Sequence, residues 1–206
     1  MNTVESLKVG FKKNKYVKVE KFIEDDICAL MNNYCVANLV AKPSMINEDL
    51  LRGENDNSKT HTVGSDLLME TFLFTYQDKI ESIVDLELCP SYSFYRVYKK
   101  GDLLKRHIDR PACEISATLT LGFDLGEMPE DEYNWGIFMN GNEVKMHPGD
   151  LVIYRGFEVE HYREPFKGAY QAQVFLHYID KKGPFYPEFK YDHSDEREMT
   201  FGKLFS

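Results

Sequence analysis

Residues 92–124 read YSFYRVYKKGDLLKRHIDRPACEISATLTLGFD, and this stretch decides the fold. Its two ends, 92–98 and 114–124, are rich in β-branched and aromatic residues, which is typical of strands. Further runs of the same kind follow, separated by Gly, Pro, Asn or Asp: 134–139, 143–146, 150–155 and 170–179. Because no helical pattern alternates with these strands, the sequence disfavours a parallel sheet. It predicts a mostly β protein, a β-sandwich or jelly roll braced by N-terminal helices.

The residues before this β-rich half carry a helical pattern. From Asp25, apolar residues recur at steps of three and four positions, which predicts an amphipathic helix. A second helix is expected after Ser65, which we predict to cap it. The apolar stripe of that second helix consists of Leu68, Phe72, Tyr76, Ile80 and Ile83. Residues 16–19 predict a short strand, and the polar, turn-rich residues 41–64 predict a long loop or a partly ordered insertion.

The composition indicates a protein with a substantial core. The chain has 206 residues, of which 43% are hydrophobic, and this is enough apolar surface to fold without disulfides. We expect one domain over 1–206, with helical support over about 22–88, a β core over about 90–179 and a C-terminal tail over 180–206. The four cysteines form no C-x-x-C pair, so we expect reduced, buried thiols and no zinc site built on them.

The charge balance disfavours several classes of partner. Lys and Arg number 25 against 34 Asp and Glu, a formal net charge of −9, which makes nonspecific binding to nucleic acid or to anionic membranes unfavourable. No apolar run approaches the roughly 20 residues of a membrane helix. The first residues, MNTVESLKVGFKKNKY, lack the apolar core of a secretory signal. We therefore expect a soluble, cytoplasmic or otherwise intracellular protein.

Two histidines and one carboxylate have the spacing of a metal site. On an extended strand His107 and Asp109 leave the same face, because they are two residues apart. His161 comes later, across the expected sandwich, and can supply a third ligand. Two histidines and a carboxylate on one face of a metal are the arrangement of non-haem Fe(II) oxygenases. The alternative is a hydrogen-bonded surface pair with a core histidine, and His177 replaces His161 as third ligand if the strand register differs.

The surroundings of these residues extend the pattern over most of the chain, from about Phe22 to Tyr178. The further elements are Tyr98, Gly101, the Pro148-Gly149-Asp150 turn, Pro165 and a strand led by Gly168. Together with the histidines and the carboxylate, they resemble the prolyl-4-hydroxylase-like branch of the 2-oxoglutarate/Fe(II)-dependent dioxygenases.

The resemblance implies a double-stranded β-helix that holds Fe(II) through His107, Asp109 and His161. It implies 2-oxoglutarate and dioxygen as cosubstrates, release of succinate and CO₂, and hydroxylation of an unactivated C–H bond. Related halogenases replace the carboxylate ligand with a small residue. The presence of Asp109 therefore favours hydroxylation.

The chain departs from this family where the distal carboxylate of 2-oxoglutarate is usually paired. A lysine or arginine is expected about ten residues after His161, but that neighbourhood carries Gln171 instead. Arg163 is our first candidate for the missing cation, because a strand places it on the same face as His161 and its guanidinium can bind a carboxylate through two hydrogen bonds. The alternative is that Arg163 forms a surface salt bridge with Glu160 or Glu164.

Other residues are weaker candidates for the cosubstrate pocket. Arg110 is second, although its place next to Asp109 points it to the opposite face, and Lys167 is third. Tyr98 corresponds to a tyrosine that often lines this pocket in the family, and core packing explains it equally well. Hydroxyl and amide donors such as Tyr98 and Gln171 are the alternative to a cation.

We predict from these features a 2-oxoglutarate- and Fe(II)-dependent hydroxylase. Two other functions remain open from the sequence: a noncatalytic jelly-roll module that binds a metal or ligand, and a cupin-type oxygenase that does not use 2-oxoglutarate. The expected substrate is a small molecule or a peptide or protein side chain, and it stays open which, because one fold hosts many specificities. We expect neither nucleic acid nor a membrane as a partner.

Overall fold

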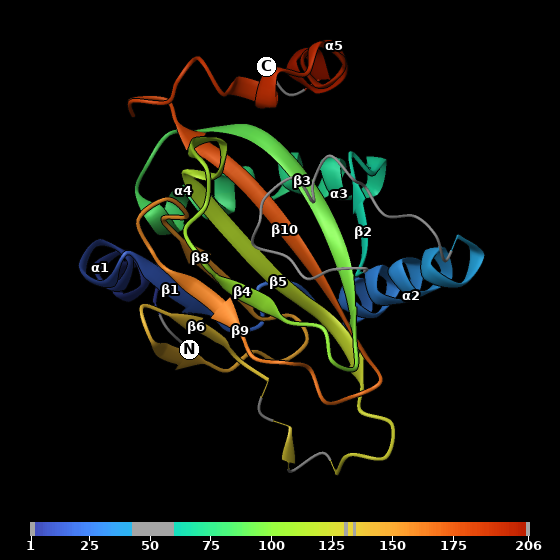
Figure 1. Cartoon of the computed structure of the whole chain (residues 1–206). Helices are drawn as coiled ribbons and strands as arrows, with labels where there is room; N and C mark the ends of the chain where they lie inside the picture. Colours follow the sequence, from blue (N-terminus) through green and yellow to red (C-terminus); the bar gives the residue numbers. More distant parts are fainter. Residues whose placement is uncertain (1–2, 43–59, 130–131, 134, 205–206) are drawn as a thin grey trace.

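The computed structural model describes residues 3–42, 60–129, 132–133 and 135–204. Two antiparallel sheets face each other and form a double-stranded β-helix, which confirms the predicted fold class (Figure 1). The larger sheet contains, in order, β1 (Tyr16–Val19), β8 (Leu151–Tyr154), β5 (Ile115–Asp124), β10 (Tyr170–Asp180), β3 (Leu88–Lys99) and β2 (His61–Gly64). The smaller sheet contains β4 (Leu104–His107), β9 (His161–Arg163), β6 (Ile137–Met139) and β7 (Asn142–Val144).

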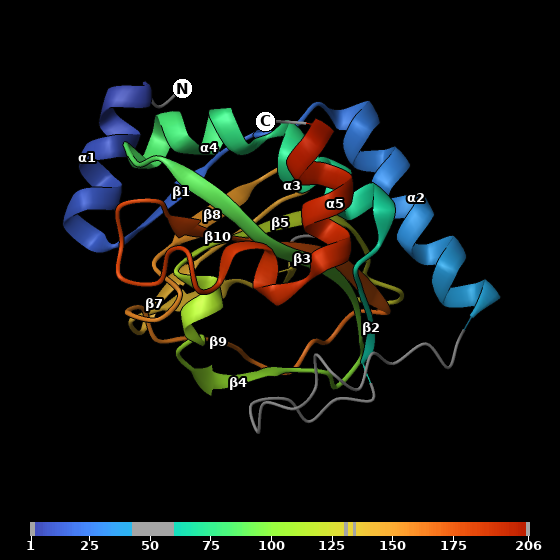
Figure 2. The same cartoon turned by 90° about the horizontal axis from the view of Figure 1, so that it is seen from above.

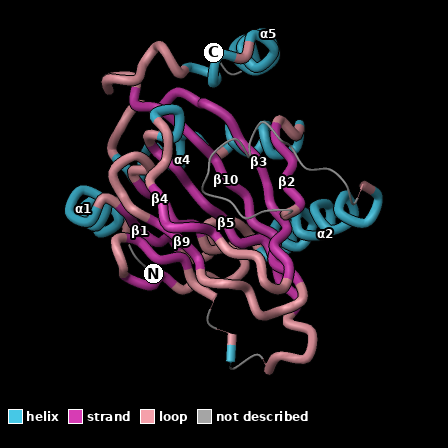
Figure 3. The backbone as a smooth tube through the Cα atoms, viewed as in Figure 1, coloured by secondary structure: helices cyan, strands magenta, loops and turns pink. Residues whose placement is uncertain are grey.

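The N-terminal helices cover the outer face of the larger sheet, opposite the strands β4 and β9 (Figure 2). They are α1 (Val4–Asn14), α2 (Asp25–Ala41), α3 (Leu67–Thr75) and α4 (Gln77–Val84). The strands form the centre of the molecule, and α1 and α2 flank it at opposite ends (Figure 3). Among the described residues, no helix is long and apolar enough to cross a membrane.

Two features of the helical half differ from the sequence-based expectation. Helix α1 was not predicted, because its lysines obscure the two positions, Leu7 and Phe11, that it buries. The expected second helix is two helices that meet at Tyr76, and Asp66 caps the first of them instead of Ser65. The Asp66 carboxylate accepts from two backbone N–H groups, at 3.1 and 3.2 Å, and its negative charge is favourable at a helix N-terminus.

The polar 41–64 segment lies mostly outside the described residues, because 43–59 are not described, and its last residues form β2. The tail after β10 forms the 3₁₀ helix η3 (Lys190–His193) and the helix α5 (Asp195–Leu204). Arg197 of α5 lies 3.2 Å from the buried Glu70 of α3, so an ion pair joins this tail to the helical layer.

The two faces of the larger sheet have different chemistry. Its outer face is apolar and packs against the helices, through residues such as Val97, Leu119 and Leu176. Its inner face carries buried polar side chains: Ser116, Thr118 and Thr120 of β5, and Gln171, Gln173 and His177 of β10. Because side chains alternate along a strand, one strand serves both the helix-facing core and a polar interior between the sheets.

Candidate metal centre

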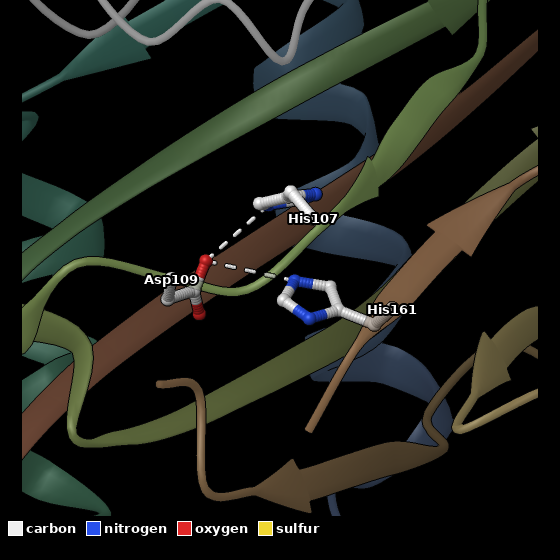
Figure 4. A group of neighbouring side chains, drawn as sticks. All are labelled: His107, Asp109 and His161. Atoms are coloured by element: carbon white, nitrogen blue, oxygen red, sulfur yellow. Dashed lines mark ion pairs between the residues drawn. The ribbon is translucent and has the colours of Figure 1, made fainter. Parts of the chain in front are cut away.

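The two histidines meet because β4 and β9 are paired. His107 and His161 are direct register partners in this antiparallel pair, and their ring centroids lie 4.3 Å apart. Asp109 follows two residues after the last residue of β4. Its Oδ1 lies 3.4 Å from Nε2 of His107 and 3.6 Å from Nε2 of His161 (Figure 4). One ligand atom of each residue therefore lies within 4.8 Å of the others, which brings together the three predicted metal ligands.

Backbone carbonyls orient both imidazoles. Nδ1 of His107 lies 2.7 Å from the carbonyl oxygen of Lys105, and Nδ1 of His161 lies 2.9 Å from that of Val159. An Nδ1–H that donates to a carbonyl leaves the Nε2 lone pair available, which is the usual way in which proteins prepare a histidine for a metal. Both Nε2 atoms are directed at the same carboxylate oxygen (Figure 4).

The charges in this group suit a divalent cation. Burial acts to raise the pKa of Asp109, but the imidazoles of His161 and His107 outweigh it and hold this pKa well below its usual range. Burial lowers the pKa of His161. For His107, burial acts to lower the pKa, but the hydrogen bond and charge of Asp109 prevail and raise it. Two imidazoles and one carboxylate are a donor set that fits Fe(II).

The group is partly exposed, at His107 and Asp109. The side chain of His161 is 2% exposed, whereas those of His107 and Asp109 retain 11% and 13%. A molecule can therefore approach the three donor atoms from the side of His107 and Asp109. From the larger sheet, Tyr154 of β8 places its hydroxyl 3.5 Å from Nε2 of His161.

Arg163 is a buried cation two residues beyond His161. Its side chain is 1% exposed, and its guanidinium lies over the ring of Trp135 at 4.6 Å. Nη1 donates to the carbonyl oxygen of Trp135 at 3.2 Å and Nη2 contacts Sδ of Met146 at 3.5 Å, whereas Nε has no partner within the described part of the chain. Burial lowers the pKa of Arg163. A desolvated guanidinium whose hydrogen-bonding contacts among the described residues are one carbonyl and one sulfur suits an anion.

Arg163 does not form the surface salt bridge with Glu160 or Glu164 that the sequence left as an alternative. Glu160 pairs instead with Arg106, at 2.7 Å between Nη1 and Oε1. Glu164 is exposed, and its backbone carbonyl accepts from the indole N–H of Trp135. In the described ranges, Arg163 forms no ion pair with either glutamate.

Tyr98 and Gln171 face the same interior as Arg163. They are register partners on β3 and β10, and both are fully buried. The ring of Tyr98 contacts Trp135 edge to face at 5.0 Å. Gln171 accepts a hydrogen bond from the hydroxyl of Tyr133 at 2.6 Å. Trp135 thus contacts both Arg163 and Tyr98, and the structure places three of the predicted cosubstrate residues, Arg163, Tyr98 and Gln171, in this interior.

The remaining candidates lie elsewhere. Arg110 forms two hydrogen bonds with Asp192 in the C-terminal tail, each of 2.7 Å, and lies over the ring of Tyr92. Its side chain is therefore directed at the tail and not at the interior. Lys167 is exposed. His177 lies outside the group formed by His107, Asp109 and His161: its Nδ1 is 3.0 Å from Oγ of Ser116, and it forms a second group of possible ligands with Asp109 and Cys113.

Sequence reasoning missed Tyr133 and Ser116, which contact Gln171 and Asp109 respectively. For Ser116 a signal was present. Hydroxyl residues alternate with apolar ones along β5, at 116, 118 and 120, and this alternation is typical of a strand with one polar face.

Comparison with known proteins finds similar folds among solved structures. No protein-family model matches the sequence, and no curated protein matches it. Among solved structures, a Pseudomonas putida prolyl-4-hydroxylase superposes with a TM-score of 0.65 at 15% identity, over 86% of this chain and 99% of the other. A Trichoplax adhaerens prolyl hydroxylase, solved with a hypoxia inducible factor peptide fragment, superposes with a TM-score of 0.64 at 15% identity, over 87% of this chain and 90% of the other. EctD from S. alaskensis, solved with 2-oxoglutarate and 5-hydroxyectoine, superposes with a TM-score of 0.63 at 11% identity, over 87% of this chain and 76% of the other. The chain is thus similar in fold to these proteins.

Proposed function

We propose that this chain is a non-haem Fe(II)- and 2-oxoglutarate-dependent dioxygenase that hydroxylates an unactivated C–H bond and releases succinate and CO₂. One observation carries the proposal. A group of two histidines and a carboxylate, partly exposed at His107 and Asp109, lies next to a buried guanidinium with no carboxylate partner among the described residues. The first feature suits the metal, and the second suits the distal end of a dicarboxylate cosubstrate.

His107, Asp109 and His161 would hold the metal. Fe(II), when bound there, supplies the redox chemistry that couples decarboxylation of 2-oxoglutarate to hydroxylation of a C–H bond by dioxygen. The Nδ1 hydrogen bonds of the two histidines keep their Nε2 atoms turned to the site. The low pKa of Asp109 keeps this carboxylate ionised, so that no proton has to leave it before a metal binds.

Arg163 would bind the distal carboxylate of 2-oxoglutarate. Its desolvation makes a charge-assisted hydrogen bond stronger than it is in water, and its planar fork can bind both oxygens of a carboxylate. Tyr98 and Gln171 line the same interior, and Trp135 covers the guanidinium and excludes water from it. This arrangement supports Arg163 as the functional replacement for the cation that the family usually places where this chain has Gln171.

We further propose that the substrate is a small molecule or a peptide side chain that approaches from the side of His107 and Asp109. The similar structures include one with a peptide and one with 5-hydroxyectoine, so the fold accommodates both classes. An intracellular location is supported by the four cysteines, all of which are free and buried.

The proposal is tested by measuring succinate formed from 2-oxoglutarate in air, with and without Fe(II). We expect succinate only when Fe(II) is present, and none from the His161→Ala variant at any Fe(II) concentration. Binding of metal without succinate would favour the noncatalytic module. Consumption of dioxygen without succinate would favour the cupin-type oxygenase.

A further inference from the structure

The two oxygens of the Asp109 carboxylate have different neighbours. Oδ1 faces the Nε2 atoms of His107 and His161, at 3.4 and 3.6 Å. Oδ2 points away from them and accepts a hydrogen bond from Oγ of Ser116 at 2.9 Å. Oδ1 is therefore placed where a metal can bind, and Oδ2 is held by a hydroxyl group.

The hydrogen bond between Ser116 and Asp109 determines which atom must donate in the contact between Ser116 and His177. Oγ of Ser116 lies 3.0 Å from Nδ1 of His177 and 3.1 Å from the carbonyl oxygen of Cys113. A hydroxyl has a single proton. If Ser116 gives it to the ionised Asp109, the contact to His177 is a hydrogen bond only when Nδ1 of His177 carries a proton and donates to Ser116.

The strand register holds this chain of groups in place. Ser116 and His177 are direct partners across β5 and β10. The ring of His177 stacks on Tyr92 at 4.5 Å, and its side chain is almost completely buried. Both residues lie on the two central strands of the larger sheet.

The main chain closes the remaining space beside Asp109. The backbone N–H of Asp109 donates to the carbonyl oxygen of Gly156 at 2.8 Å. A Cβ at position 156 would lie 2.4 Å from Oδ2 of Asp109 and 2.7 Å from Oγ of Ser116, so only glycine fits there. The carboxylate is thus confined on the side of Oδ2.

We infer that Ser116 and His177 are positioning residues that fix Asp109 so that Oδ1 alone is offered to the metal. The inference rests on the proposed function only in that a metal binds at His107, Asp109 and His161. Without the Ser116 hydroxyl the carboxylate can rotate, and a rotated carboxylate binds the metal less well. Removal of hydrogen-bonding partners behind metal ligands typically weakens metal binding by roughly ten- to a hundredfold.

The test measures metal binding and not turnover. Metal-free wild type and Ser116→Ala are titrated anaerobically with Co(II) and with Fe(II), against a coloured competing chelator. We expect Ser116→Ala to bind both metals about ten- to a hundredfold more weakly and to change the visible Co(II) spectrum. The matched control is Ser93→Ala. Ser93 is also a buried serine bonded to a carboxylate, Oε1 of Glu70 at 3.1 Å, but it belongs to the helix-facing side of the larger sheet. We expect the metal affinity of Ser93→Ala to equal that of the wild type.

Two substitutions test the role of His177 as a hydrogen-bond donor to Ser116. Asparagine places an amide N–H near the position of Nδ1, whereas leucine offers no donor. We expect His177→Asn to bind Co(II) like the wild type and His177→Leu to bind it more weakly. Thermal unfolding followed by circular dichroism identifies variants that are not folded, and His177→Leu tests the inference if Ser116→Ala does not fold.

Several results would overturn the inference. Wild-type affinity and an unchanged Co(II) spectrum in both Ser116→Ala and His177→Leu would remove the positioning role, while the proposed function would stand. A thiolate-to-Co(II) absorption band would put the metal on Cys113 and His177, which also lie within 4.8 Å of Asp109. Failure of the wild type to bind either metal would instead contradict the proposed function.

Discussion

His107 and His161 are register partners across β4 and β9, and their rings lie 4.3 Å apart although they come from distant parts of the sequence. This pairing places the histidines of the candidate metal centre on the smaller sheet. The residues behind the Asp109 carboxylate come from the larger sheet, on β5 and β10. The site therefore depends on how the two sheets face each other.

The first prediction concerns the metal ligands. His107→Ala, Asp109→Ala and His161→Ala should each abolish Fe(II)-dependent succinate formation, because each removes one of three donors. All three side chains lie at the interior of the site and outside the main apolar cluster, so the variants should remain folded by circular dichroism. Full activity of His161→Ala together with loss of activity in His177→Ala would show that the third ligand is wrongly assigned.

The second prediction concerns the buried cation. Arg163→Ala should raise the KM for 2-oxoglutarate by about ten- to a hundredfold or more, because a charge-assisted hydrogen bond is lost and a buried carboxylate is left unpaired. Arg163→Lys should recover part of this loss, since an ammonium group lacks the planar fork. Steady-state kinetics at saturating metal measures both.

Arg110→Ala is the matched control for Arg163→Ala, because it removes a guanidinium whose partner is Asp192 in the tail. Its KM for 2-oxoglutarate should stay at the wild-type value. An unchanged KM in Arg163→Ala beside a large rise in Arg110→Ala would transfer the carboxylate contact to Arg110.

The third prediction concerns Gly156. A methyl group there would lie 2.2 Å from the carbonyl oxygen of Cys113 and 2.4 Å from Oδ2 of Asp109, so Gly156→Ala should destabilise the protein by about 1–3 kcal/mol. The control is Gly10→Ala in α1. The nearest atom to its new methyl group is Cγ2 of Val17 at 3.6 Å, and the change should stabilise the helix by about 0.5–1 kcal/mol. Urea unfolding measures both, and equal effects of the two substitutions would show that the space beside Asp109 is larger than described.

The fourth prediction concerns pH. Burial raises the pKa of Glu70 above its usual value, and the opposing effects of Arg197 and Ser93 are smaller. A raised pKa means that the folded state favours the protonated form. The contribution of Glu70 to stability is thus fully present below its unfolded-state pKa and is lost as pH rises through the folded-state pKa. The free energy of unfolding of wild type minus that of Glu70→Gln should therefore fall as pH rises from about 4 to 7. Urea unfolding at several pH values measures it, and a difference that grows with pH would contradict the assignment.

The sequence predicts the β half of the molecule better than the helical half. The strand expected at 16–19 is β1, and those expected at 114–124 and 170–179 agree with β5 and β10 to within a residue. These strands have dense β-branched and aromatic residues, so their pattern is strong. Helix α1 has two buried residues among several lysines, and its amphipathic pattern is correspondingly weak. That residues 1–206 form one domain stays a prediction.

Only part of the candidate site could be predicted from the sequence. His107 and Asp109 could be predicted because their two-residue spacing and residue types together indicate a metal site, and His161 was added as a later histidine across the sandwich. The positions of Ser116 and His177 depend on the pairing of β5 with β10, which no local pattern specifies. The burial of Arg163 likewise depends on Trp135 from a separate segment, which covers the guanidinium.

The measurement that tests the central claim most directly is the visible absorption of the anaerobic protein loaded with Fe(II) as 2-oxoglutarate is added. We predict a weak charge-transfer absorption that grows to saturation in the wild type, needs a higher 2-oxoglutarate concentration in Arg163→Ala, and is absent in His161→Ala. A wild-type protein that binds Fe(II) and develops no such absorption at any 2-oxoglutarate concentration would contradict the account.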